Sequence, residues 1–110
     1  LNEIRLLASI DMPYVISYKC SFYVQEIQSL CIVMEYADGG DLYEKIVQHK
    51  NKKTKFSEVD IWEIFIQIVK GLRYLHELKI LHRDLKCANV FLNVDGTVKL
   101  GDLNVSKVAK

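Results

Sequence analysis

Acidic, amide and basic side chains gather in two short stretches late in the chain. Residues 82–89 read His-Arg-Asp-Leu-Lys-Cys-Ala-Asn, and residues 101–104 read Gly-Asp-Leu-Asn. The side chains that could take part in catalysis or metal binding are two carboxylates, an amide and an ammonium: Asp84, Asp102, Asn89 and Lys86. Carboxylate and amide oxygens suit Mg²⁺, and a lysine can neutralise a moving phosphoryl group. The two stretches together predict a site for a divalent cation and a phosphate.

A β-hairpin is needed to bring these two stretches together. Residues 90–93 and 97–100 are apolar-rich runs on either side of Val94-Asp95-Gly96. Asp-Gly between such runs is a hairpin signal, and a hairpin returns Asp102 to the vicinity of Asn89. The polar residues also suit turns and caps. The joint pattern H-R-D-L-K-x-x-N, hairpin and G-D-L nevertheless favours the functional interpretation far more than a lone H-R-D would.

The rest of the chain predicts helices and an antiparallel strand pair around this site. Apolar residues at spacings of three and four indicate a long helix opened by Ser57. Asp41 is a plausible cap for a shorter helix. The expected elements are a helix at 1–10 ended by Asp11-Met12-Pro13, strands at 14–24 and 30–36, a helix at 42–48 and the long helix at about 57–78.

Length, composition and charge exclude several classes of protein. The 110 residues fit one domain or part of one, with 50% apolar residues and a net charge of +1. This near-neutral charge argues against nucleic-acid binding by bulk electrostatics. The longest apolar run, residues 30–34, is too short to span a membrane, and no signal-peptide layout is present. The chain does not begin with Met and starts in a helical pattern, so we expect a fragment.

Three cysteines without a C-x-x-C pair predict neither a zinc site nor a disulfide framework. We expect Cys20, Cys31 and Cys87 to be reduced thiols, and we favour buried small hydrophobic residues over reactive groups.

Residues 82–89 resemble the catalytic loop of eukaryotic protein kinases, and the resemblance extends along the whole chain. The motifs I-V-M-E-Y-x-x-G-G-D-L and H-R-D-L-K-x-A-N-V-F-L are most similar to the NIMA-related (NEK) serine/threonine kinases. The resemblance implies part of an α+β, two-lobed kinase fold, with the end of helix C, strands 4–5, the hinge, helices D and E, the catalytic loop and strands 7–8. Residues 1–36 would belong to the N-lobe, 37–41 to the hinge and 42–110 to the C-lobe.

This resemblance implies transfer of the γ-phosphoryl group of ATP to serine or threonine hydroxyls of proteins. Asp84 would orient the hydroxyl and accept its proton, and Lys86 would contact the transferring phosphate, as in the serine/threonine form of the loop. Asn89 and Asp102 would bind Mg²⁺. The presence of all four residues favours an active enzyme over an ATP-binding pseudokinase that acts as a scaffold. A small interaction domain with a coincidental H-R-D is a third possibility.

The resemblance also implies an adenine pocket next to the hinge. Glu35 and Ala37 would offer backbone groups to the adenine, and Met34 would stand behind the pocket as gatekeeper. Asp41 would reach the ribose or the substrate, and Phe91 would form the pocket floor. Taken alone, Met34 and Phe91 fit equally well as core residues, and Asp41 also fits as a helix cap.

Six further residues would have structural or regulatory roles. Glu3 would be the ion-pairing glutamate of helix C. Arg83 would pair with a phosphorylated activation loop, or else form a local salt bridge. His82 is better explained as a packed, hydrogen-bonded residue than as an acid or base. The packing column between the lobes would consist of Leu7, Tyr18, His82 and Leu103.

The main departure from the family pattern is Asn104, which replaces the glycine of the Asp-Phe-Gly element. Asn tolerates positive φ best after glycine, so we expect an ordered, active-like loop. The glycine-rich loop, the strand-3 lysine, the activation segment and the later C-lobe helices are absent from the sequence, so we expect the fragment alone to be inactive. The implied partners are ATP, Mg²⁺ and protein substrates, with no nucleic acid and no membrane insertion. By analogy with the family, we also expect partners among cell-cycle, microtubule or ciliary proteins. The expected location is the cytoplasm, the nucleus or the cytoskeleton.

Overall fold

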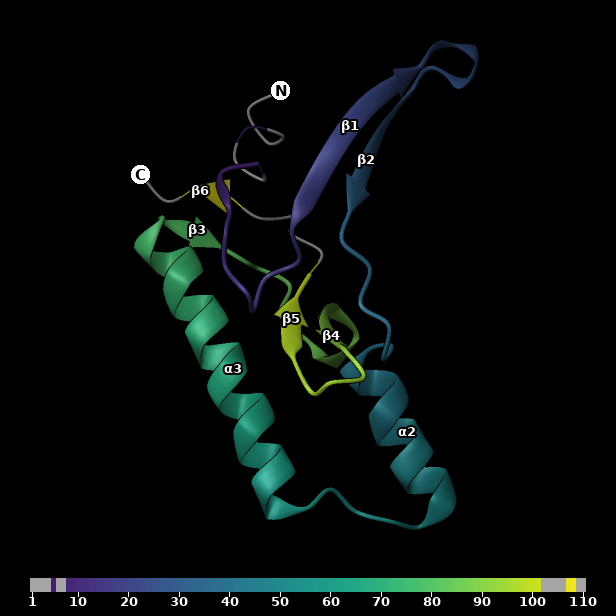
Figure 1. Cartoon of the computed structure of the whole chain (residues 1–110), viewed down its shortest axis with the longest axis vertical. Helices are drawn as coiled ribbons and strands as arrows, with labels where there is room; N and C mark the ends of the chain where they lie inside the picture. The colour runs from purple at the N-terminus through teal and green to yellow at the C-terminus, as the bar shows by residue number, and fades with distance from the viewer. Residues whose placement is uncertain (1–4, 6–7, 102–106, 109–110) are drawn as a thin grey trace.

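The computed structural model describes residues 5, 8–101 and 107–108, the last two as backbone only. Figure 1 shows long helices, a projecting hairpin and several short strands. In chain order, the elements are β1 (Tyr18–Val24), a 3-10 turn (Gln25–Ile27), β2 (Ser29–Met34), α2 (Leu42–Lys52), α3 (Glu58–Glu77), β3 (Ile80–Leu81), a second 3-10 turn (Cys87–Asn89), β4 (Val90–Leu92), β5 (Val98–Leu100) and β6 (Lys107–Val108).

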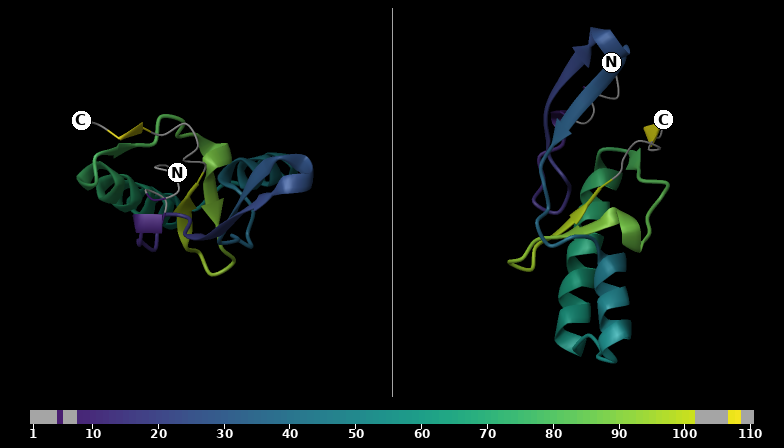
Figure 2. Two further views of the ribbon diagram at one scale, coloured as in Figure 1. Left: turned by 90° about the horizontal axis from the view of Figure 1, so that it is seen from above. Right: turned by 90° about the vertical axis from the view of Figure 1, so that its right-hand side faces the viewer.

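Strands β1 and β2 form an antiparallel hairpin that projects away from the helices (Figures 1 and 2). Phe22 lies opposite Cys31 in its register, and the turn is closed by Gln28 in the left-handed conformation, with φ 50°. The expectation of a strand over residues 14–24 was too long. Tyr14 and Ile16 bond to the backbone of Leu100 instead, at 2.8 and 2.9 Å, so this segment lies along β5.

Side-chain caps define where α2 and α3 begin. The Asp41 carboxylate accepts a hydrogen bond from the backbone N–H of Glu44 at 2.8 Å, and the Ser57 hydroxyl accepts one from the N–H of Asp60 at 3.1 Å. Each cap satisfies an N–H group that has no partner within its helix. Helix α2 extends to Lys52, beyond the expected end at residue 48. Helix α3 has 20 residues, close to its predicted bounds.

The core lies where α3 crosses β5. Gly71 permits the close approach, because a Cβ atom there would lie 2.9 Å from a methyl carbon of Leu100 and 3.0 Å from the carbonyl oxygen of Tyr14. Burial of apolar side chains at this crossing is the main stabilising contribution to this part of the fold. The buried core consists of Ile10, Val15, Leu75, Ile80, Val90, Leu92, Val98 and Leu100.

Strands β4 and β5 form the predicted antiparallel hairpin, with Val90 opposite Leu100. Its turn contains Gly96 at φ 94°, and the Asp95 carboxylate accepts a hydrogen bond from the N–H of Thr97 at 2.9 Å. The side chain of Gln67 ties the hairpin to α3: it accepts from the N–H of Val98 at 2.8 Å and donates to the carbonyl of Gly96 at 3.2 Å. The hairpin is therefore held on a rigid helix.

The expectation that all three cysteines are buried is wrong. Cys20 is exposed, whereas Cys31 and Cys87 are partly buried, and all three are free thiols. Cys20 and Cys31 lie on the projecting hairpin, in whose two strands no side chain is fully buried. Within the described part of the chain, no helix has the length and apolar character needed to cross a membrane.

Candidate active site

A pocket lies between the β1–β2 hairpin and the β4–β5 hairpin. It is lined by all five residues expected to bind the nucleotide: Met34, Glu35, Ala37, Asp41 and Phe91. Ile16 and Gly101, which were not expected there, also line it. The two sides of the pocket therefore come from segments that are far apart in the sequence.

The loop between β2 and α2 is fixed against β4 by backbone hydrogen bonds. The N–H of Gly39 donates to the carbonyl of Leu92, and the N–H of Leu92 donates to the carbonyl of Gly40, both at 2.8 Å. The Asp38 carboxylate accepts from the N–H of Val94 at 2.9 Å, while the Asn93 side chain accepts from the N–H of Asp38 at 3.3 Å. The loop that forms one wall of the pocket thus has a defined position.

Asp41 lies in the pocket wall and also caps α2. Its backbone forms an isolated antiparallel bridge with Phe91, and one carboxylate oxygen accepts from the N–H of Glu44. The capping role considered from the sequence is therefore present, and Asp41 also lies at the pocket.

Asp84 and Asn89 contact each other directly. The Asn89 side-chain amide donates to the main-chain carbonyl of Asp84 at 2.7 Å and to a carboxylate oxygen of Asp84 at 3.2 Å. Asn89 is buried, so these bonds fix the loop between the two residues. The Lys86 ammonium lies 3.8 Å from the Asp84 carboxylate, with 60% of the lysine side chain exposed. An ion pair this exposed contributes little to stability.

Gly101 links this loop to the pocket. Its N–H donates to the carbonyl of Asn89 at 3.0 Å, and its own carbonyl bonds to the His82 ring. His82 is 3% exposed and also accepts a hydrogen bond from the N–H of Asp84 through Nδ1, at 3.3 Å. Since Gly101 lines the pocket, one continuous set of hydrogen bonds connects Asp84 and Asn89 to a residue of the pocket wall.

Two other expected residues have defined positions. Arg83 is exposed and has φ 70°, an uncommon backbone conformation for a non-glycine residue. Tyr18 begins β1 opposite Met34, and its hydroxyl donates to the hydroxyl of Ser21 at 2.9 Å. Tyr18 thus lies beside Met34, whereas Arg83 faces solvent.

Five residues singled out from the sequence lie outside the described residues: Glu3, Leu7, Asp102, Leu103 and Asn104. Within the described part, no cluster of three or more His, Cys, Asp or Glu side chains forms a metal site. The donor set nevertheless fits Mg²⁺: the Asn89 amide uses its N–H group on Asp84, which leaves its oxygen as a hard ligand of the type that Mg²⁺ prefers. Asn89 is followed by the hairpin that leads to Gly101 and then to Asp102.

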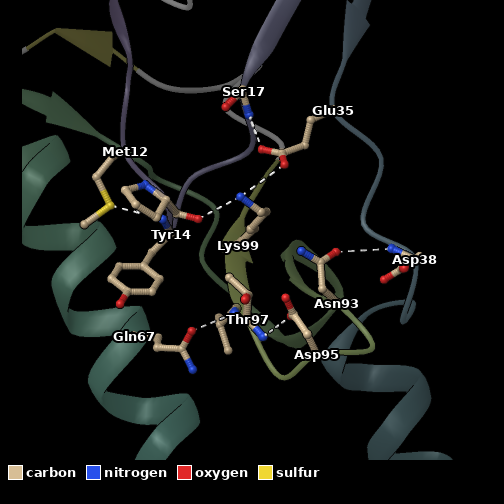
Figure 3. Close-up of polar contacts among 12 residues, drawn as sticks. Met12, Tyr14, Ser17, Glu35, Asp38, Gln67, Asn93, Asp95, Thr97 and Lys99 are labelled. Carbon is tan, nitrogen blue, oxygen red and sulfur yellow. Dashed lines mark hydrogen bonds and ion pairs between the residues drawn. The ribbon is translucent and has the colours of Figure 1, made fainter.

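An ion pair behind the pocket was not expected from the sequence. The Lys99 ammonium lies 3.1 Å from one carboxylate oxygen of Glu35 and donates to the carbonyl of Pro13 at 2.8 Å (Figure 3). The other Glu35 oxygen accepts from the N–H of Ser17 at 2.8 Å. The only signal in the sequence was a lysine between Val98 and Leu100, two apolar residues of a predicted strand.

These contacts change the acidity of Glu35. Burial by itself raises the pKa of this carboxyl group and is the largest single effect. Two contacts lower the pKa: the hydrogen bond from the Ser17 backbone, and the hydrogen bond and positive charge of Lys99. Together they outweigh the effect of burial on the pKa. The net result is a pKa lowered from the ordinary value of a glutamate, so Glu35 is ionised at neutral pH.

The whole chain, residues 1–110, matches the family model of the protein kinase domain. The chain therefore belongs to the protein kinase domain family, and its fold is part of the α+β kinase fold. Members of this family use ATP, typically together with a divalent metal ion.

Comparison with curated proteins shows which kinases the chain is similar to. It is 44% identical over 107 residues to serine/threonine-protein kinase Nek1 of Mus musculus, 42% over 106 residues to Nek11 of Homo sapiens and 45% over 107 residues to Nek5 of Mus musculus. These alignments cover 97%, 96% and 96% of this chain but only 9%, 16% and 16% of the relatives. The predicted resemblance to NIMA-related kinases is confirmed, and the chain spans less than a fifth of these relatives.

Proposed function

We propose that this chain is the central part of a protein serine/threonine kinase domain that transfers the γ-phosphoryl group of ATP to serine and threonine hydroxyls. The main support is the set of hydrogen bonds that joins Asn89 directly, and Asp84 through His82, to Gly101, which lines the pocket. A nucleotide held in that pocket would present its phosphates to the Asp84–Asn89 loop.

In the proposed reaction, the substrate hydroxyl oxygen forms a bond to the γ-phosphorus while the bond between this phosphorus and the β–γ bridging oxygen breaks. Asp84 orients the hydroxyl and accepts its proton, and ADP leaves. The Asp84 carboxylate is partly exposed, with 38% of its side chain accessible, so a substrate hydroxyl can reach it. Lys86, which lies beside Asp84, is placed to contact the transferring phosphate.

Asn89 and Asp102 would hold Mg²⁺, which when bound supplies charge neutralisation to the phosphates. The hydrogen bonds from Asn89 to Asp84 orient the Asn89 side chain so that its oxygen is available. The backbone groups of Glu35 and Ala37 would bind the adenine, with Phe91 beneath it. Met34 would limit the depth of the pocket.

The proposed domain division assigns residues 1–36 to the N-lobe, 37–41 to the hinge and 42–110 to the C-lobe. On this division, the chain carries one wall of the nucleotide site and the catalytic loop but not the glycine-rich loop or the activation segment. Positioning of ATP needs groups on both sides of its phosphates. We therefore propose that activity belongs to the longer protein, whose substrates would be proteins with accessible serine or threonine.

The experiment is a phosphotransfer assay with the full-length protein that contains this chain. It would use γ-labelled ATP, Mg²⁺ and peptides that differ only in carrying serine, threonine or tyrosine. We expect label on the serine and threonine peptides and none on the tyrosine peptide. Label on tyrosine alone would contradict the proposal, and nucleotide binding without transfer to any peptide would favour the pseudokinase scaffold instead.

A further inference from the structure

The Glu35–Lys99 ion pair joins three separate segments behind the nucleotide pocket. Glu35 follows β2 and lines the pocket, Lys99 lies in β5, and Pro13 and Ser17 lie in the segment that precedes β1. Figure 3 shows the backbone nitrogen of Ser17 and the side chain of Lys99 both directed at the Glu35 carboxylate. Each carboxylate oxygen has a different partner: Ser17 N–H at 2.8 Å and Lys99 at 3.1 Å.

Glu35 is held at its backbone as well as its side chain. Its N–H donates to the carbonyl of Ser17 at 2.8 Å, while its carboxylate accepts from the N–H of the same residue. Two parallel bonds to Ser17 fix both the position and the rotation of Glu35. The bond to Lys99 then ties this unit to β5.

Lys99 faces the same side of the β4–β5 hairpin as the pocket floor. It lies directly opposite Phe91 in the antiparallel register, and directly paired residues place their side chains on one face. Phe91 lines the pocket. The ion pair therefore couples the strand that carries the floor of the pocket to the loop that forms its wall.

Stability alone is a weak reason for placing this charge here. Only 11% of the Lys99 side chain and 22% of the Glu35 side chain are exposed. Removing two charges from water is costly, and an apolar pair of similar size is often as stable, so a buried ion pair is weak evidence for stability. At this position, the pair fixes the pocket wall, which includes Glu35, relative to the pocket floor, where Phe91 lies opposite Lys99 on the β4–β5 hairpin.

We propose that Lys99 is a positioning residue for the nucleotide: through Glu35, it fixes the pocket wall relative to the Phe91 floor and so sets affinity for the adenosine part of ATP. This inference rests on the proposed kinase function. Lys99 acts through Glu35 and touches neither the phosphates nor the hydroxyl acceptor. Its loss therefore weakens nucleotide binding without slowing the transfer step.

The test uses the full-length protein and the variant Lys99→Met, which keeps the length of the side chain and removes its charge. We expect KM for ATP to rise about tenfold, the effect of losing one charge-assisted hydrogen bond, while kcat changes by less than about twofold. The inhibition constant of adenosine is expected to rise by the same factor. That of inorganic triphosphate with Mg²⁺ is expected to stay constant, because the pair lies at the adenosine end.

Three further variants separate positioning from general loss of structure. Lys99→Arg keeps the charge and is expected to restore KM. Glu35→Gln keeps the acceptor for Ser17 but removes the charge, so it should match Lys99→Met, and the double variant should be no worse than either single one. Arg73→Met breaks the exposed Arg73–Glu77 pair of α3 and is the matched control, with KM unchanged.

Each outcome decides the question. Unchanged KM and adenosine inhibition in both Lys99→Met and Glu35→Gln would overturn the inference, as would an equal loss of adenosine and triphosphate binding. If Lys99→Met does not fold, Glu35→Gln carries the same comparison. A wild-type protein that binds neither ATP nor adenosine would overturn the proposed function itself, whereas wild-type binding that both variants retain would overturn only the role of Lys99.

Discussion

The side-chain amide of Asn89 donates hydrogen bonds to both the main-chain carbonyl and the carboxylate of Asp84, at 2.7 and 3.2 Å. The proposed catalytic base and the proposed metal ligand are thus parts of one bonded loop. The position of each depends on the other, which the five-residue spacing alone did not show.

Replacing Asn89 with aspartate should destabilise this loop. An acidic side chain cannot donate to the Asp84 oxygens, and it would bring a second carboxylate next to Asp84. We expect the free energy of unfolding to fall by about 2 kcal/mol, the usual loss when a buried polar group loses its partner. Chemical denaturation of the full-length protein measures this. The outcome that contradicts the prediction is a variant as stable as the wild type.

Replacing Asp41 with alanine should weaken the start of α2. The N–H of Glu44 would lose its acceptor, at a cost of about 1 kcal/mol. Asp41→Asn keeps a capping oxygen and should retain most of the stability, so it serves as the matched control. Thermal unfolding would test both variants, and an Asp41→Ala variant with no loss would show that the cap contributes nothing.

Gly71→Ala is expected to destabilise the protein, although alanine favours a helix by about 1 kcal/mol. The new methyl group would lie 2.9 Å from Leu100 Cδ1 and 3.0 Å from the Tyr14 carbonyl oxygen. Separating α3 from β5 by enough to relieve this contact should cost about 1–3 kcal/mol. Glu63→Ala, at an exposed position of the same helix, should change stability by less than about 0.5 kcal/mol. Stabilisation by Gly71→Ala would mean that this close approach does not exist.

The lowered pKa of Glu35 predicts a loss of stability in acid. Its pKa in the folded protein lies below the ordinary value of a glutamate in an unfolded chain, 4.5. The stabilisation is therefore complete above that value and is lost as the pH falls through the lower, folded-state pKa. Unfolding measured from about pH 6 to about pH 3 should show a steeper decline for the wild type than for Glu35→Gln. Parallel pH profiles of the two proteins would contradict this.

Local signals in the sequence were sufficient for the helices and for the β4–β5 hairpin. Ser57 and Asp41 act as the caps that their residue types suggested, and Asp95 and Gly96 form the turn. The resemblance to a family was sufficient to select five residues that line one pocket. All of these depend on interactions between near neighbours or on a pattern of known spacing.

Contacts between distant segments could not be predicted in the same way. Residues 14–16 have the composition of a strand, but Tyr14 and Ile16 bond to Leu100 of β5 rather than extending β1. No local pattern in the sequence specifies that partner. Lys99 looked like an ordinary charged strand residue until the fold placed Glu35 and Pro13 against it. The exposure of Cys20 likewise depends on a hairpin that projects away from the core.

The most direct test of the proposed kinase function is the variant Asp84→Asn in the full-length protein, measured for both phosphotransfer and ATP binding. The amide keeps the size of the side chain but is a far weaker proton acceptor than the carboxylate. We predict that turnover falls by a factor of at least about 100, as expected for the loss of a general base, while the Kd for ATP with Mg²⁺ stays within about threefold. Unchanged turnover in Asp84→Asn would contradict the assignment of this loop as the catalytic centre.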